Sequence, residues 1–353
     1  MQAVGSALSS PPRLEDPRGL AILREEWNDL AVAVGGGIFA TWEWADAWLR
    51  HHGRGRERLV HSCRGDDGRL ETVIPLYVWR QRRPRVLRFI GHGPSDALGP
   101  IHSTAERHRV DTRLMQTLAN LKWDVFAGEQ LPGGESWSAR LGGRTWRREP
   151  SPVLHVGEGG WDAYLSDRSA NFRQQLGRRW RALKRAGTVR FRLAEAGTLD
   201  ADLDLLFALH QGRWRGGSTD FTDTPFHRDV AWAALQRGWL RLWFLEVNDQ
   251  PVAAWHGFQV GRIANYYQAG RDPAYERLSV GFVLLAHTVR SAIEEGAAEY
   301  RFGRGGEPFK YRFTEDDLGL ESVALTRGIP GRLALECARG ARRTRDIFRD
   351  WVR

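Results

Sequence analysis

The sequence has few of the residues that cross-link a chain or hold it in a membrane. Only two of its 353 residues are cysteines. Cys63 and Cys337 lie far apart, so they indicate neither a disulfide framework nor a cysteine-based metal site. No stretch approaches the roughly 18 apolar residues of a membrane span, and residues 1–20 lack the basic and apolar segments of an export signal. We therefore expect a cytoplasmic protein without a membrane span or a bound metal.

Lysine is almost absent, and arginine carries most of the positive charge. Lys122, Lys184 and Lys310 are the only lysines among 52 basic residues, and the net charge is +9. Such an excess has two interpretations, a solvated basic surface or a face that binds an anion. The densest basic cluster has helical spacing, and the phosphates of a cofactor would suffice as its partner; it comprises Arg173, Arg178, Arg179, Arg181, Lys184 and Arg185.

The chain is long enough for two domains, and its pattern repeats. With 42% hydrophobic residues it is globular. The first half predicts helices near 19–33, 41–51 and 104–119 and strands near 57–64, 70–79 and 123–127. The second half predicts helices near 170–186 and 199–214 before a similar series of strands. We expect two α/β units, residues 1–150 and 151–330, followed by a basic C-terminal helix over 331–353.

Residues 240–302 predict a sheet with a cleft. Apolar strands at 240–247, 252–260 and 263–269 are separated by tight turns and should form an antiparallel meander. A helix over 281–295 and a strand at 298–302 follow. Because strand–helix–strand units are almost always right-handed, the strands at 263–269 and 298–302 should lie side by side and parallel.

Five motifs resemble the GNAT superfamily of acyl-CoA N-acyltransferases, and within it the bacterial CelD-like group related to Fem-type peptidoglycan aminoacyl transferases. The resemblance covers most of the chain. It implies tandem GNAT-like domains, each a mixed, mostly antiparallel sheet with flanking helices. The motifs are Trp161–Leu165, Arg178–Leu183, Leu209–Trp214, Gly270–Pro273 and Gly303–Phe313.

In this family the coenzyme pyrophosphate binds at the start of the central helix, where unpaired N–H groups and the helix dipole favour an anion. The resemblance thus implies an acyl-CoA cosubstrate, acetyl-CoA first among them. Its predicted contacts are Arg277, Ser279, Val280, Gly281 and Phe282. The family's first glycine is replaced by Ser279, and the basic residue is displaced to Arg277. An ordinary helix start capped by Ser279 is the alternative.

Two strand residues are candidates for proton transfer. His256 shares a strand face with Ala254 and Phe258, and Tyr267 shares one with Asn265 and Ala269. Each is either a packed core residue or a catalytic group. We predict that His256 is the base, because histidine titrates near neutral pH. This assignment requires the His256 ring to face the cleft.

The segment after the last strand supplies further catalytic candidates. Glu307, Lys310 and Tyr311 follow a glycine-rich turn, and we predict that Glu307 and Lys310 orient the acceptor or transfer a proton, with Tyr311 protonating the departing thiolate. Three positions depart from the group's pattern. Arg301 and Gly306 stand where the group has aspartate, and Phe309 stands where it has tyrosine.

The end of the 199–214 helix offers substrate-binding candidates, His210, Arg213 and Trp214. The arginine would hold an acceptor carboxylate or phosphate, and the loop at 216–219 would act as a lid. A packing motif at the helix end is the alternative.

Three functions remain open from the sequence. The first is transfer of an acyl group, acetyl or longer, from acyl-CoA to a primary amine of a small or amino-sugar-like acceptor. The second is a Fem-type transferase, in which aminoacyl-tRNA would be the only nucleic-acid partner. The third is a non-catalytic member that uses the cleft for binding. The sequence indicates no oligomeric state.

Overall fold

The computed structural model describes residues 13–14, 21–79, 83–134, 136–213, 221 and 223–340. Chain contacts divide the protein into two compact units. The first combines residues 1–34, 48–148 and 320–353, and the second combines 35–47 and 149–319. Each unit therefore contains a short segment from the other half of the sequence.

The first unit is built on a mixed sheet. Its strand order is β1-β2-β3-β4-β6-β14-β7, with β5 paired to β3. Strands β4 and β6 are parallel, and β6 pairs antiparallel with β14. The bounds are β1 Arg13–Leu14, β2 Arg56–Arg64, β3 Leu70–Trp79, β4 Val86–Phe89, β5 Ile101–His102, β6 Val125–Pro132, β7 Arg144–Glu149 and β14 Leu320–Thr326.

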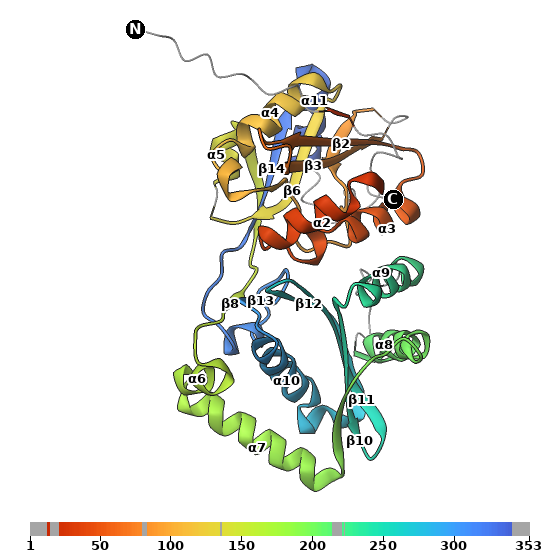
Figure 1. The fold of residues 1–353 in the computed structure, drawn as a ribbon, viewed down its shortest axis with the longest axis vertical. Helices are drawn as coiled ribbons and strands as arrows, with labels where there is room; N and C mark the ends of the chain where they lie inside the picture. The colour runs from red at the N-terminus through yellow and green to blue at the C-terminus, as the bar shows by residue number, and fades with distance from the viewer. Residues whose placement is uncertain are drawn as a thin grey trace. The chain divides into compact units, whose positions relative to one another are not determined.

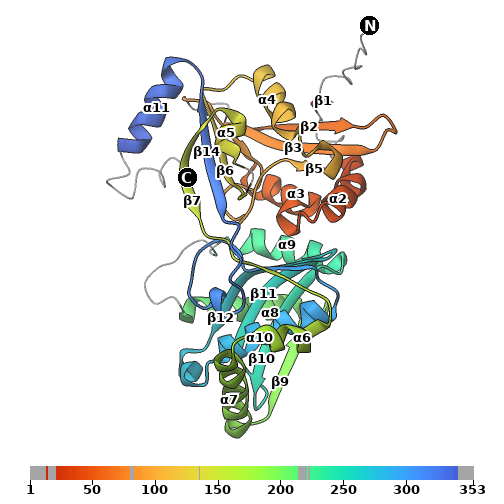
Figure 2. The same cartoon turned by 90° about the vertical axis from the view of Figure 1, so that its left-hand side faces the viewer.

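Helices flank this sheet (Figure 2). The apolar side of α4 presents Leu114 and Leu118 to strand residues such as Leu76 and Phe126 in a single buried cluster. Helix α2 contacts β3 and β5, and α11 contacts β6 and β14. The bounds are α2 Arg24–Ala33, η2 Thr104–Glu106, α4 Val110–Asn120, α5 Trp137–Leu141 and α11 Gly328–Gly340. Helix α3, Trp42–His52, begins in the second unit and ends in the first.

The second unit has a six-stranded sheet in the order β8-β13-β12-β11-β10-β9. Strands β12 and β13 are parallel, and the other neighbours are antiparallel. The predicted pairing of 263–269 with 298–302 is confirmed. The bounds are β8 Val153–His155, β9 Val189–Leu193, β10 Leu240–Val247, β11 Gln250–Val260, β12 Ile263–Arg271 and β13 Glu299–Arg301. Both units thus have mixed, mostly antiparallel sheets with flanking helices, as expected.

Helices cover both faces of the second sheet (Figure 1). Helix α10 packs on one face, where α6 and α7 contact it; α8 lies against β11 and β12 on the other face, together with α9 and η1. The bounds are η1 Ile38–Ala40, α6 Gly160–Asp167, α7 Ala170–Ala186, α8 Leu199–Arg213, α9 Thr224–Gln236, η3 Pro273–Leu278, α10 Val280–Glu294 and η4 Lys310–Arg312.

Polar side chains of β12 and β13 hold the segment 35–47 in the second unit. Arg301 donates to the Gly35 carbonyl at 2.8 Å, and the Asn265 Oδ1 accepts from the Ile38 N–H at 3.2 Å. Gly37 has φ +68°, and a Cβ there would lie 2.5 Å from Asn265 Oδ1. Arg301, which stands where the resembling group has aspartate, is therefore occupied in binding this segment.

Two predicted features lie outside the described residues. These are the proposed lid at 216–219 and residues 341–353 of the expected C-terminal helix, of which α11 covers the first part. No described helix combines the length and apolar character that a membrane crossing requires.

Candidate active site

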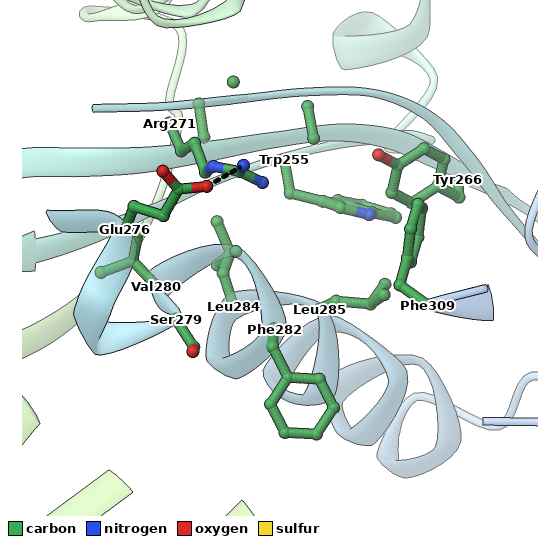
Figure 3. A pocket seen from close by; sticks show the side chains of 14 residues that line it. Trp255, Tyr266, Arg271, Glu276, Ser279, Val280, Phe282, Leu284, Leu285 and Phe309 are labelled. Carbon is green, nitrogen blue, oxygen red and sulfur yellow. Dashed lines mark hydrogen bonds and ion pairs between the residues drawn. The ribbon is translucent and has the colours of Figure 1, made fainter. Parts of the chain in front are cut away.

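A cavity lies beside the part of β12 that extends beyond the end of its parallel neighbour, β13. Strand β13 pairs with β12 only from Ile263 to Asn265, and β12 then continues to Arg271. Beyond Asn265, no described strand pairs with this edge of β12. The space between β11, β12 and α10 forms a cavity of about 350 Å³. Figure 3 shows its lining, with charged side chains near the start of α10 and aromatic rings at the other end.

The start of α10 supplies backbone donors to the cavity. Phe282 and Val283 donate to the Ser279 carbonyl at 3.0 and 3.2 Å. Helix geometry leaves the N–H groups of Val280 and Gly281 without an intrahelical acceptor. Ser279 lies at φ 56°, and its side chain makes no capping hydrogen bond. Ser279 thus stands at the N-cap position, as the alternative predicted, but it does not cap the helix through its side chain.

Gly281 leaves open space at this end of the cavity. A Cβ added there would meet only the Arg271 Cδ, at 3.9 Å. The packing of the chain itself therefore does not require glycine at this position. The missing side chain instead gives a ligand room to approach the helix backbone.

Positive side chains surround the start of α10. Within the cavity, Arg271 pairs with Glu276 at 2.9 Å. On α7, Arg179 donates to the Arg277 carbonyl at 3.5 Å. The Arg312 guanidinium lies 3.9 Å from the centre of the Phe282 ring, and burial, followed by the charge of Arg179, lowers the Arg312 pKa. This gathering of guanidinium groups favours an anion at this end.

The predicted cofactor residues divide into two groups. Ser279, Val280, Gly281 and Phe282 line the cavity. Arg277 is exposed and is not among the lining residues. The sequence thus located the helix start, while the arginine that lines the cavity is Arg271, at the end of β12.

Aromatic side chains form the opposite end of the cavity. The centre of the Tyr266 ring lies 5.9 Å from that of Trp255 and 6.2 Å from that of Phe309. Leu284 and Leu285 of α10 complete this part of the wall. The tyrosine hydroxyl is the polar group that Figure 3 shows among these rings, apart from the indole nitrogen.

A β-bulge decides which side chains of β12 reach the cavity. Gly257 is opposite Tyr266 and His256 is opposite Gln268, so Tyr267 is an extra residue between them. Because residues directly opposite each other share a face, the bulge reverses the alternation beyond this point. Ala269, opposite Trp255, therefore faces the cavity, whereas Tyr267 faces away from it. The prediction that Tyr267 and Ala269 share a face is wrong for this reason.

His256 lies on the face of the sheet opposite the cavity. Its ring packs against Phe258 and Tyr267, with centroid distances of 4.9 and 5.6 Å. The side chain is fully buried, and neither ring nitrogen has a hydrogen-bond partner among the described residues. Burial lowers its pKa to about 3. The expectation that His256 faces the cleft is wrong, because its position on β11 directs the ring towards α8 and α9.

His210 joins this second cluster. Its Nδ1 lies 3.0 Å from the Ala269 carbonyl oxygen, and its ring is 5.1 Å from that of Phe221. Phe221 is also 6.1 Å from the rings of both His256 and Tyr267. The structure therefore gathers three predicted site residues around Phe221, away from the cavity. Trp214 and the side chain of Arg213 lie outside the described residues.

Lys310 is a buried contact of the turn after β13. Its Nζ donates to the carbonyls of Gly303, Arg304 and Gly305 at 3.3, 2.7 and 3.0 Å, and pairs with Glu307 at 2.8 Å. Only 3% of the side chain is exposed. The ammonium group is therefore positioned to hold the turn, not to reach a ligand in the cavity.

Tyr311 lies on the surface of the same turn. Its hydroxyl donates to Asp317 Oδ2 at 2.5 Å, and this hydrogen bond is the main cause that raises the Tyr311 pKa to about 12. Neither Tyr311 nor Glu307 lines the cavity. Gly306 is closely covered, since a Cβ there would lie 3.0 Å from Pro150.

Sequence reasoning missed three cavity residues, Trp255, Tyr266 and Arg271. Trp255 and Tyr266 are each adjacent in sequence to a predicted site residue, and Arg271 lies within the Gly270–Pro273 motif, for which the sequence predicted no role. The bulge explains the choice of Tyr267 over Tyr266, since a one-residue irregularity is invisible in an apolar strand pattern. Among the described residues, no group of three or more His, Cys, Asp or Glu side chains is arranged to hold a metal ion.

Comparisons with known proteins agree with this geometry. The model of an acetyltransferase (GNAT) domain matches residues 170–311. A search of curated proteins returned no match. Among solved structures, the chain resembles FemX with a TM-score of 0.64 at 10% identity, over 86% of this chain and 96% of that one.

Two further structures have similar folds. L-PGS from Bacillus licheniformis has a TM-score of 0.54 at 12% identity, over 96% of this chain and 100% of that one. The C-terminal domain of a putative lysylphosphatidylglycerol synthetase from Agrobacterium fabrum also has 0.54, at 14% identity, over 91% and 97%. At these identities the likeness concerns the fold. Residues 170–311, which contain the cavity between β12 and α10, are the part of the chain that matches the model of a GNAT acetyltransferase domain.

Proposed function

We propose that this protein transfers an acyl group from acyl-CoA to a primary amine of a small or amino-sugar-like acceptor. The observation that carries the proposal is the cavity between β12 and α10. It extends from the start of α10 along the part of β12 that no described strand pairs with, and then to an apolar end. A long ligand with phosphates at one end and a thioester at the other has the matching polarity.

The phosphates would bind at the start of α10. Val280 and Gly281 line the cavity and have N–H groups without an intrahelical acceptor, the helix dipole favours an anion, and Arg271 is within the cavity. Arg179 and Arg312 lie beside it. The amide groups of the coenzyme arm would then meet the edge of β12 beyond Asn265, where no described strand pairs with it, much as an added strand meets a sheet.

The reaction needs little covalent assistance from the protein. The amine nitrogen forms a bond to the thioester carbonyl carbon, the carbon–sulfur bond breaks, the nitrogen loses a proton and the thiolate gains one. We assign protonation of the thiolate to Tyr266, whose hydroxyl lies in the cavity wall (Figure 3). Glu307, about half exposed and two residues before Phe309, is the remaining candidate for the amine proton.

The Fem-type alternative has one observation in its favour. Helix α7 carries six basic and no acidic residues, a composition suited to a polyanion such as tRNA. An aminoacyl group, however, brings an α-ammonium that requires a carboxylate when it is buried. Glu276 is the only carboxylate among the cavity-lining residues, and it pairs with Arg271 at the helix start. The cavity therefore favours an uncharged acyl group.

Gly281→Val tests the proposed site. A Cβ at this position meets only Arg271, so we expect the variant to fold with an unchanged melting temperature. Its side chain would occupy the space beside the helix backbone, and we expect acetyl-CoA affinity in calorimetry to fall by at least about tenfold, the loss of roughly one charge-assisted hydrogen bond.

Gly197→Val is the matched control, because a Cβ at Gly197 has no atom within 4 Å and the residue lies away from the cavity lining. Equal affinity of the Gly281 variant and the wild type would place the coenzyme elsewhere. Absence of coenzyme binding to the wild type, together with salt-dependent tRNA binding, would replace the proposal with the Fem-type alternative.

A further inference from the structure

The polarity of the cavity gives a bound acyl-CoA a direction. The charged lining residues, Arg271 and Glu276, both lie near the start of α10, and the proposed phosphate contacts are there too. An elongated ligand held at that end places its acyl group towards Trp255, Tyr266 and Phe309. This step rests on the proposed function, since it takes the coenzyme as the ligand.

The acyl end has an apolar wall. Trp255 is 3% exposed, and its ring and that of Phe309 flank Tyr266 at 5.9 and 6.2 Å. Leu284 and Leu285 face them from α10. None of these side chains carries a charge, so a charged acyl group would lose its hydration here without gaining a partner.

The apolar wall at this end is larger than an acetyl group can cover. Side chains in a protein interior normally pack with few voids larger than a water molecule, and an empty apolar cavity costs stability. The cavity as a whole has a volume of about 350 Å³, and its lining residues include Trp255, Tyr266 and Phe309. An acetyl methyl group would contact only a small part of such a wall.

We propose that the acyl group transferred by this protein is uncharged, apolar and larger than acetyl, of the medium-chain or aromatic class, and that Trp255 and Phe309 select it. Each methylene buried against the wall strengthens binding by about fourfold at most. The side chain of Phe309 contributes carbon surface where the resembling group has a tyrosine hydroxyl, which makes the wall less polar.

Calorimetry with CoA, acetyl-CoA and hexanoyl-CoA tests the inference without knowledge of the acceptor. We expect hexanoyl-CoA to bind at least about tenfold more tightly than acetyl-CoA, because partial burial of four methylenes is sufficient for that ratio. Phe309→Trp, which adds volume to the wall, should bring the ratio of the hexanoyl-CoA affinity to the acetyl-CoA affinity down to about one. Phe309→Leu is the matched variant that should retain part of it.

The outcomes separate this inference from the proposed function. Equal affinities for acetyl-CoA and hexanoyl-CoA in the wild type would overturn the inference and leave the acyl-CoA function standing. Tighter binding of β-alanyl-CoA, whose acyl group is cationic, would overturn it as well. No binding of any of the coenzymes would overturn the proposed function, and the inference with it.

Discussion

Replacement of Lys310 by methionine should destabilise the turn after β13 and leave the residues that line the cavity unchanged. The ammonium group bonds three backbone carbonyls, of Gly303, Arg304 and Gly305, and pairs with Glu307. Methionine has a similar length but no donor. The three carbonyls would then lose their shared partner, and the Gly303 bond is buried.

The magnitude follows from these contacts. Hydrogen bonds from a charged donor contribute about 1.5–3 kcal/mol each, and solvent can replace part of the loss at the two less buried carbonyls. Removing one partner of a buried charged network costs about 3–5 kcal/mol. We expect a loss of about 3 kcal/mol, which lowers the melting temperature by about 6–12 °C in a unit of this size.

Thermal unfolding of the full-length protein, followed by tryptophan fluorescence, measures this effect. Lys122→Met is the matched control, because it removes the same charge from an exposed position. Glu307→Gln should cost less than about 1 kcal/mol, since its side chain is 49% exposed. We expect the Lys310 variant to retain the coenzyme affinity of the wild type.

One result would refute this reasoning. If Lys310→Met melts within about 2 °C of the wild type but loses turnover or coenzyme binding, the ammonium group acts on a ligand and not on the turn. The original prediction of acceptor orientation by Lys310 would then stand.

The remaining predictions concern Tyr266 and His256. Tyr266→Phe should lower kcat by about 10- to 100-fold with little change in acyl-CoA affinity, and unchanged turnover would exclude the hydroxyl as proton donor. His256, whose pKa is lowered from 6.5 to about 3, is neutral when folded, so the unfolded chain binds more protons below pH 6.5 and stability falls as pH decreases towards 3. In urea titrations between pH 7 and 5, the wild type should lose about 2 kcal/mol more unfolding free energy than His256→Leu. The control His108→Leu, at an exposed position, should show the same change of unfolding free energy with pH as the wild type. An equal change in all three proteins would contradict the burial of His256.

The local pattern of the sequence was sufficient to predict most of the helices and strands of the second unit. Apolar periodicity and turn residues predicted α7 over 170–186 with its observed bounds, and α10 and β10 to within one residue. The order of elements then implied the parallel pairing of β12 and β13. These features depend on neighbours in sequence, on helix and strand periods and on the handedness of the crossover, all of which a single sequence contains.

The sequence predicted a site position well where the order of the backbone elements alone sets that position. The start of α10 was located correctly because a strand, a turn and a helix in series place it, whatever the side chains do. The roles of Lys310 and Tyr311 were harder to predict, because a glycine-rich turn folds back on itself, and only its closed form brings the lysine to three carbonyls and the tyrosine to Asp317.

The sequence by itself determined the two α/β units, the strand and helix order around the cavity and the helix start that faces it. The tertiary structure decided which face each side chain of the sheet occupies, because the bulge at Tyr267 adds one residue to β12 and reverses its alternation. It also decided that residues 35–47 belong to the second unit, through contacts from Arg301 and Asn265 to a segment more than 200 residues away. Long-range hydrogen bonds and single-residue shifts of register leave no periodic signal, so they are determined only when the sheet and its covering helices pack together.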